Sequence, residues 1–202
     1  MVDTRKSDTA RSILYAAKES LLDTGLNGLS TRSIAEAAGV PLSQIHYHFG
    51  SKQRLVLAVL EAENERLLER QQQMFESDLP LWKQWEQACE FLDDDLESGY
   101  VRILHEMIAA GWSDPDIAAV VWRQLSGWQD LLAEVARRAA AKLGGLGPFT
   151  PEEIGVLASV PFIGAEAYLL MGVPEKEYPA RSALRKVGDI LKAMEEGADA
   201  SP

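Results

Sequence analysis

The chain has 202 residues, enough for one large domain or two smaller ones with a buried core. Its hydrophobic content of 47% and charged content of 25% are ordinary for a soluble globular protein. Cys89 is the single cysteine, which excludes an internal disulfide framework and fits a reducing cytoplasm. We expect neither a signal peptide nor a transmembrane helix, because few apolar residues precede Ile13 and no uncharged apolar run reaches the length of a membrane span.

The net charge of −11 is distributed unevenly along the chain. Residues 1–60 hold seven Lys and Arg against five Asp and Glu, whereas the remainder holds 13 against 26. A phosphate-contacting N-terminal part and an acidic body held away from nucleic acid would produce this asymmetry. A difference of this size also arises by chance.

Residues 1–6 are expected to form a disordered arm, in which Arg5 and Lys6 either reach a DNA backbone or are solvated. From Ser7 to Thr24 the apolar positions recur at helical spacing and predict an amphipathic helix that ends at Gly25. Packed across the segment that follows, this helix would complete a small core.

Residues 30–52 predict two short helices separated by a turn. Ser30 or Thr31 can cap the first helix, and Gly39 ends it because glycine adopts the left-handed conformation without steric cost. Pro41 suits the first turn of the second helix. That helix is expected to bury Leu42, Ile45, His46 and Phe49 and to expose Ser43, Gln44, Tyr47 and His48. The pair is either a helix-turn-helix for a DNA major groove or an ordinary helical hairpin with a solvated polar face.

The same residues resemble the DNA-binding region of the TetR-type (TetR/AcrR) bacterial transcriptional regulators. The residues that match this family's pattern in order and spacing are Ile34-Ala35, Ala38-Gly39-Val40, Phe49 and Ser51-Lys52. One departure is His46, which stands where the family usually has Tyr, with Tyr47 one step later.

The resemblance implies a ligand-responsive regulator, most simply a repressor, that binds a pseudo-palindromic operator as a homodimer. Phosphate contacts would come from Ser30, Thr31, Arg32 and Lys52. Base edges would be faced by Gln44 and Tyr47, with Ser43 and His48 beside them.

A long helix from Lys52 to about Glu76 follows, and further helices are predicted at about 80–97, 99–112, 114–143, 151–171 and 180–196. No segment alternates with period two, so we expect an all-α fold without a sheet. The predicted domains are a three-helix DNA-binding domain at 7–53 and a helical ligand-binding and dimerisation domain at 54–197, with the long helix joining them. The tail after Gly197 is expected to be disordered.

Aromatic and sulfur-containing side chains concentrate beyond residue 80, where TetR-type proteins bind an effector. They either line a pocket or fill the core. The candidates, together with His105, are Trp82, Trp85, Cys89, Met107, Trp112, Trp122, Trp128, Phe162 and Tyr168. His105 is either a core histidine or a polar anchor.

Residues 151–171 are apolar nearly all round, and a helix of this kind must be covered on all sides. With a second apolar stripe at 180–194 it could form a four-helix homodimer interface, as the resemblance implies, or it could be an internal core helix.

The run Asp93-Asp94-Asp95 is interpreted as a solvated face. No nucleophile–base set, phosphate loop or zinc spacing occurs, so we expect no enzyme, no cofactor and no metal site. The alternative to a cytoplasmic DNA-binding regulator is a helical small-molecule-binding or protein-interaction module that does not bind DNA. The net charge of −11 favours this alternative.

Overall fold

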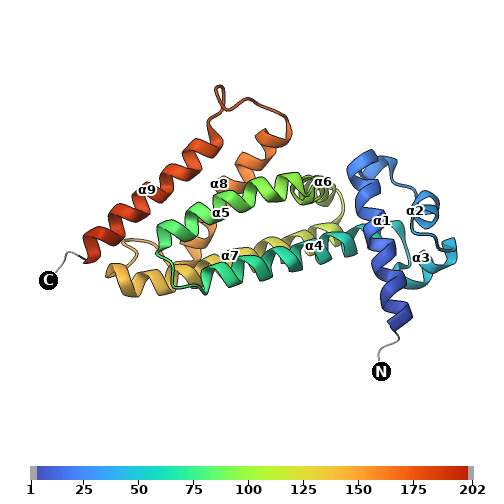
Figure 1. The fold of residues 1–202 in the computed structure, drawn as a ribbon, viewed down its shortest axis with the longest axis horizontal. Coiled ribbons are helices and arrows are strands. Elements are labelled where there is room, and N and C mark those ends of the chain that lie inside the picture. The colour runs from blue at the N-terminus through green and yellow to red at the C-terminus, as the bar shows by residue number, and fades with distance from the viewer. Residues whose placement is uncertain (1–3, 200–202) are drawn as a thin grey trace. The chain divides into compact units, whose positions relative to one another are not determined.

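The computed structural model describes residues 4–199, and this part of the chain is α-helical without a β-strand (Figure 1). The all-α prediction is therefore confirmed. The helices are α1 (Thr4–Gly28), α2 (Thr31–Ala37), α3 (Leu42–Phe49), α4 (Lys52–Phe75), α5 (Leu81–Glu97), α6 (Tyr100–Gly111), α7 (Pro115–Leu143), α8 (Pro151–Leu170) and α9 (Ala180–Asp199).

The helix ends follow the punctuation of the sequence. Gly25, Gly39 and Gly50 all have positive φ at or beside a predicted break. At the start of α8, Thr150 and Glu153 form a reciprocal capping box, which satisfies two of the free N–H groups of the first turn. Two terminal predictions were wrong in part: α1 begins at Thr4, within the expected disordered arm, and α9 continues beyond Gly197 to Asp199. Residues 1–3 and 200–202 lie outside the described chain.

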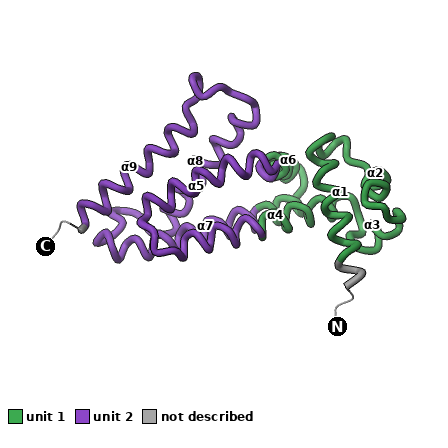
Figure 2. The backbone as a smooth tube through the Cα atoms, in the orientation of Figure 1, with its two compact units in different colours: residues 1–65, 102–121 green, residues 66–101, 122–202 purple. Residues whose placement is uncertain are grey.

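The chain divides into two compact units (Figure 2). Unit 1 comprises residues 1–65 and 102–121, and unit 2 comprises residues 66–101 and 122–202. Unit 1 is therefore discontinuous in sequence, and it includes most of α6 and the start of α7. The predicted boundary at 53/54 falls inside unit 1.

The core of unit 1 joins α1 to the two short helices and to the first half of α4. α1 packs against α2 and α3, and α2 packs against α3. The fully buried side chains in this core include Ile13, Leu21, Ile34, Ile45, Leu55 and Leu60. Their burial supplies the main stabilisation that two short helices cannot generate alone.

Unit 2 is built around α5, α8 and α9, and α9 runs alongside α5 (Figure 1). Its core cluster contains Cys89, Leu92, Phe162, Ala165, Ala180 and Leu184. The indole N–H of Trp85 donates to the carbonyl of Leu184 over 2.6 Å and so ties α5 to α9. α8 approaches α7 at Gly155, where an added Cβ would lie 2.7 Å from the carbonyl oxygen of Gln129.

One face of α8 is apolar and exposed in the single chain. By length and composition α8 is also the one helix among residues 4–199 that could cross a bilayer. An exposed apolar stripe of this kind also fits a helix covered by another protein chain. The exposed large side chains on α8 and just after it are Val156, Leu157, Val160, Tyr168, Leu170 and Met171.

Candidate nucleic-acid interface

Residues 30–52 fold into the helix-turn-helix that the sequence predicts. The hydroxyl of Ser30 accepts a hydrogen bond from the N–H of Ser33 over 3.5 Å and caps α2. The turn contains Gly39 at φ 67°, with no atom within 4 Å of the position of a Cβ. Ile34 and Ile45 are fully buried on the inner side of the two helices. The turn and the buried contacts together fix which side of α3 faces outward.

The outward side of α3 carries hydrogen-bonding side chains rather than charges. The Tyr47 side chain is 61% exposed and Ser43 is also exposed. Gln44 and His48 are half-buried, and the His48 ring packs edge-on against Tyr47 with centroids 5.1 Å apart. Groups of this type can donate to and accept from base edges in a major groove.

The expected burial of His46 beside Ile45 was wrong. His46 is exposed, and its Nδ1 lies 3.2 Å from the carbonyl oxygen of Gly50, next to the end of α3. By contrast, Nε2 of His48 is buried without a hydrogen-bond partner. At about 3.6 residues per turn, His46 lies about 100° around α3 from the buried Ile45, whereas His48 lies only about 60° from it, so helical spacing itself favours the burial of His48.

The residues proposed for phosphate contact lie at the ends of α2 and α4. Ser30 and Arg32 are exposed, and Thr31 and Lys52 are half-buried. Lys52 opens α4, whose first turn is capped by the Ser51 hydroxyl accepting from the N–H of Arg54 over 3.2 Å. All eight candidate DNA-contacting residues therefore belong to unit 1.

The structure does not gather the ten candidate effector residues into one place. Trp85, Cys89, Trp128 and Phe162 meet in the unit 2 core, where both indoles pack edge-on against the Phe162 ring. The remaining six are dispersed. Trp112 and Trp122 are exposed, Tyr168 packs on Tyr178, Trp82 lies beneath the amines of Lys83 and Lys192, and His105 and Met107 belong to unit 1.

Burial raises the pKa of the Cys89 thiol to about 11, and the neighbouring carboxylates of Asp93, Glu86 and Glu90 add to the effect while Arg185 opposes it. The thiol is therefore protonated at neutral pH and acts as a small apolar core group.

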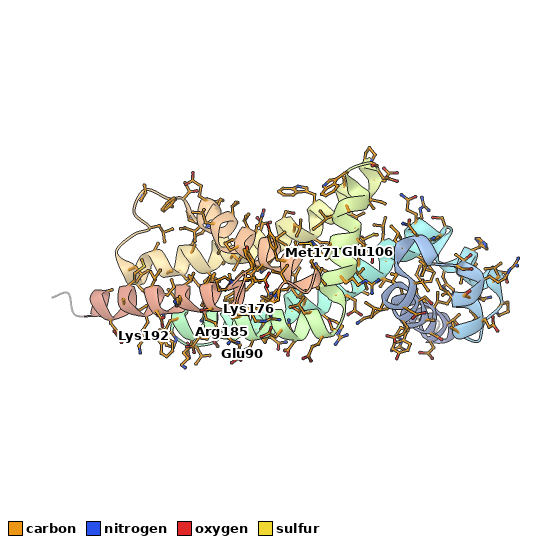
Figure 3. All side chains as sticks on the ribbon, turned by 90° about the horizontal axis from the view of Figure 1, so that it is seen from above. Glu90, Glu106, Met171, Lys176, Arg185 and Lys192 are labelled. Carbon is orange, nitrogen blue, oxygen red and sulfur yellow. The ribbon has the colours of Figure 1, made fainter. Side chains whose placement is uncertain are left out.

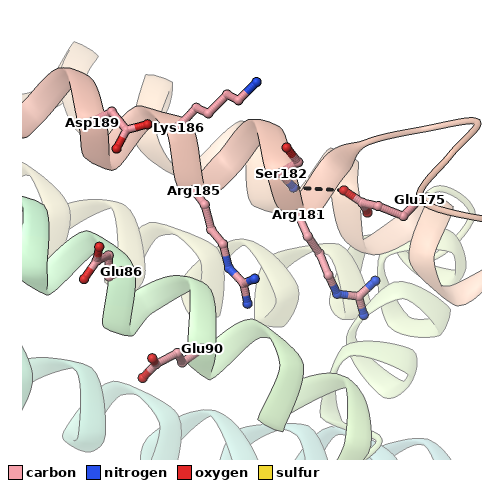
Figure 4. A pocket seen from close by; sticks show the side chains of 8 residues that line it. All are labelled: Glu86, Glu90, Glu175, Arg181, Ser182, Arg185, Lys186 and Asp189. Carbon is pink, nitrogen blue, oxygen red and sulfur yellow. Dashed lines mark hydrogen bonds between the residues drawn. The ribbon is translucent and has the colours of Figure 1, made fainter.

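A groove of about 740 Å³ lies between α5 and α9 and has a charged lining. Figure 3 places Glu90 on α5, and Arg185 with Lys192 on α9. In Figure 4 the guanidinium groups of Arg181 and Arg185 extend from α9 toward α5. The full lining is Glu86, Glu90, Glu175, Arg181, Ser182, Arg185, Lys186 and Asp189, and it includes none of the ten predicted effector residues.

Ion pairs to α4 and α9 correct the interpretation of the acidic run on α5. Asp93 accepts from Arg181 over 2.7 Å, and Asp95 receives two hydrogen bonds of 2.8 Å from Arg70. These two carboxylates tie α5 to α9 and to α4, whereas Asp94 remains mostly exposed. The sequence alone does not reveal this role, because the arginines lie far from the aspartates along the chain. Among the described residues, no three His, Cys, Asp or Glu side chains converge in a way that could hold a metal ion.

Known proteins match both the helix-turn-helix and the whole fold. Residues 13–59 match the family of bacterial regulatory proteins named after tetR. The HTH-type transcriptional regulator UidR of Escherichia coli K12 is 24% identical over 150 residues, which cover 70% of this chain and 71% of UidR. Within residues 13–59 the chain therefore carries the DNA-binding region of the TetR family.

Solved structures extend the likeness in fold to the remaining helices. A transcriptional regulator assigned to the TetR family in Rhodococcus sp. superposes with a TM-score of 0.77 at 21% identity, over 92% of this chain and 98% of that one. FadR of Bacillus subtilis, solved in complex with stearoyl-CoA, superposes with a TM-score of 0.74 at 13% identity, over 90% of this chain and 96% of FadR. The family match and the likeness to UidR support a DNA-binding transcriptional regulator of the TetR type.

Proposed function

We propose that the protein is a cytoplasmic repressor that binds a pseudo-palindromic operator as a homodimer and releases it when a small molecule binds residues 54–197. The observation that carries the proposal is the outward side of α3, where Tyr47 and Ser43 are exposed directly after a buried helix-turn-helix core. Residues 7–53 would form the domain that contacts DNA. The supporting likeness is the family match over residues 13–59.

The proposed roles on DNA divide between base reading and phosphate contact. Gln44 can make a bidentate contact with adenine, worth about 1–3 kcal/mol, and Tyr47 faces base edges beside it. Lys52, with Ser30, Thr31 and Arg32, contacts phosphates and sets the register. An operator can be obtained by selection from a random duplex pool and then used in gel-shift titrations at several salt concentrations.

Two substitutions test this division. Gln44→Ala is expected to change the sequence preference. Lys52→Ala is expected to weaken all sequences alike and to reduce the salt slope by about one unit. A changed preference in Lys52→Ala would show that the division is wrong. If the wild type shows no salt-sensitive specific binding, the alternative of a helical binding module is correct.

The homodimer would form through the exposed apolar sides of α8 and α9. Val160 on α8 and Ile190 on α9 are among the exposed large apolar residues, and Gly164 has no atom within 4 Å of a Cβ position, which allows a second helix to approach closely. Sedimentation velocity should give a dimer for the wild type and a monomer for Val160→Lys. Lys83→Glu on the exposed side of α5 is the control, and it should remain dimeric. A wild-type monomer that needs detergent for solubility would favour a membrane span instead.

The effector would bind unit 2, where Trp85 and Trp128 border the Phe162 ring. The bound stearoyl-CoA of FadR supports a small-molecule site in this fold and does not identify the ligand of this chain. A fluorescence-quenching screen should use Trp112→Phe/Trp122→Phe, because these two exposed indoles would otherwise dominate the background. A true effector quenches the remaining tryptophans and also releases the selected operator.

A further inference from the structure

The end of α1 is attached to α6 by two side chains that lie 80 residues away in sequence. Arg102 and Glu106 are four residues apart on α6, and Nε of Arg102 lies 3.2 Å from Oε1 of Glu106. The second carboxylate oxygen of Glu106 accepts from the N–H of Leu26 over 2.7 Å. Arg102 donates to the carbonyl oxygen of Leu22 over 2.7 Å. All of these residues belong to unit 1, and Figure 3 shows Glu106 on α6.

These two contacts replace the helical hydrogen bond that α1 loses at its kink. In an unbroken helix the N–H of Leu26 would donate to the carbonyl of Leu22. Gly25 prevents this because its φ of 67° and ψ of 177° are not helical. Instead, the Leu22 carbonyl accepts from Arg102, and the Leu26 N–H donates to Glu106. A Cβ at Gly25 would lie 3.4 Å from the Glu106 carboxylate, so the two segments are already in contact.

The attachment is directional rather than only electrostatic. An exposed ion pair between residues four apart on one helix contributes little by itself. Here Arg102 and Glu106 each make a further hydrogen bond to the α1 backbone. Hydrogen bonds of charged groups are stronger than those between neutral groups. A backbone target also fixes the position of α1 along α6, which a contact between two flexible side chains would not do.

We infer that Arg102 and Glu106 are positioning residues that hold α1, and with it the recognition helix, in place on α6. α1 packs directly on α2 and α3, so a displacement of α1 displaces α3. In a dimer the two copies of α3 must lie about 34–36 Å apart to enter successive major grooves. The Arg102–Glu106 joint therefore sets the half-site spacing that the protein accepts. This inference rests on the proposed function.

The test measures discrimination between operator spacings. The duplexes are the selected palindrome and versions in which the spacer between half-sites is one base pair longer or shorter. We expect Glu106→Ala to lose about tenfold of the wild-type preference for the selected spacing, about the value of one charge-assisted hydrogen bond. Glu106→Gln can still accept from Leu26 and should keep most of the preference. Arg137→Met is the control, because it removes exposed ion pairs with Glu134 and Glu152 in unit 2.

The outcomes separate this inference from the proposed function. A uniform loss of affinity at every spacing in Glu106→Ala would show a role in stability alone and would overturn the inference. Equal loss in Glu106→Gln and Glu106→Ala would overturn its hydrogen-bonding basis. A wild type that binds no selected duplex would overturn the proposed function instead. Amide hydrogen exchange without DNA then tests the hydrogen bond between Glu106 and Leu26 directly. The Leu26 N–H should be protected in the wild type and should exchange faster in Glu106→Ala, and an unchanged exchange rate would refute the inference.

Discussion

The ion pair between Lys18 on α1 and Glu63 on α4 gives a quantitative test of the unit 1 packing. Nζ of Lys18 lies 2.8 Å from Oε2 of Glu63, and the two side chains are only 15% and 17% exposed. At an effective dielectric constant of about 20, this separation corresponds to a gross attraction of about 6 kcal/mol. Desolvation of two charges offsets most of it, and we expect a net coupling of about 1.5–3 kcal/mol. The surface pair of Lys83 and Glu86 lies at 3.0 Å with side chains 46% and 47% exposed, and it should give about 0–1 kcal/mol.

The assay is a double-mutant cycle in urea, followed by the circular dichroism of the helices at a fixed protein concentration. The variants are Lys18→Met, Glu63→Gln and their combination, and the cycle cancels the other contacts of each residue. A matched cycle on Lys83 and Glu86 is the control. The coupling of the α1–α4 pair should change little between about 0.05 and 0.5 M salt, because partly buried pairs are screened less than exposed ones. A coupling no larger than that of the surface pair would refute the reasoning.

Three further outcomes follow from single residues. Gly155→Ala should destabilise the protein by about 1–3 kcal/mol because its Cβ would overlap the carbonyl of Gln129, whereas Gly164→Ala should not destabilise the protomer. Thermal unfolding of both variants in the monomeric Val160→Lys background checks this. The pKa of the Cys89 thiol is about 11 in the folded protein and about 9 in the unfolded chain. The contribution of the thiol to the free energy of unfolding is therefore complete below pH 9 and is lost as the pH rises toward 11. In urea titrations of Cys89→Ala, the free energy of unfolding should fall less steeply at alkaline pH. His46→Tyr introduces the family's usual residue at an exposed site, and we expect retained operator binding in gel shifts and a change in unfolding free energy within about 0.5 kcal/mol.

Local signals were sufficient to predict the helices and the helix-turn-helix. Gly25 and Gly39 mark breaks because glycine, which lacks a Cβ, adopts positive φ without steric cost, and the buried Ile34 and Ile45 follow directly from helical spacing. The terminal extensions of α1 and α9 were missed because these polar ends carry few apolar residues.

Long-range packing was beyond the reach of the sequence. Trp85 and Trp112 are both tryptophans of the aromatic region beyond residue 80, yet Trp85 donates a hydrogen bond inside the unit 2 core and Trp112 is exposed. The assignment of α6 to unit 1 depends on contacts such as Glu106 to Leu26, which no periodicity reveals. The ion pairs of Arg181 and Arg185 on α9 with Asp93 on α5 likewise join residues that lie far apart in sequence.

Unit 1 is formed by two separate segments of the chain, and this limits how the protein can be recombined with its relatives. A chimera cut once, after the first four helices, would leave behind Arg102 and Glu106, and also Asp114, which accepts from Gln53 at the start of α4 over 2.7 Å. A graft of DNA specificity onto another sensing half therefore has to carry residues 102–121 as a second insert, joined within α6 and α7. Chimeras joined at 65/66, 101/102 and 121/122 should give folded, DNA-binding regulators more often than chimeras joined at a single position.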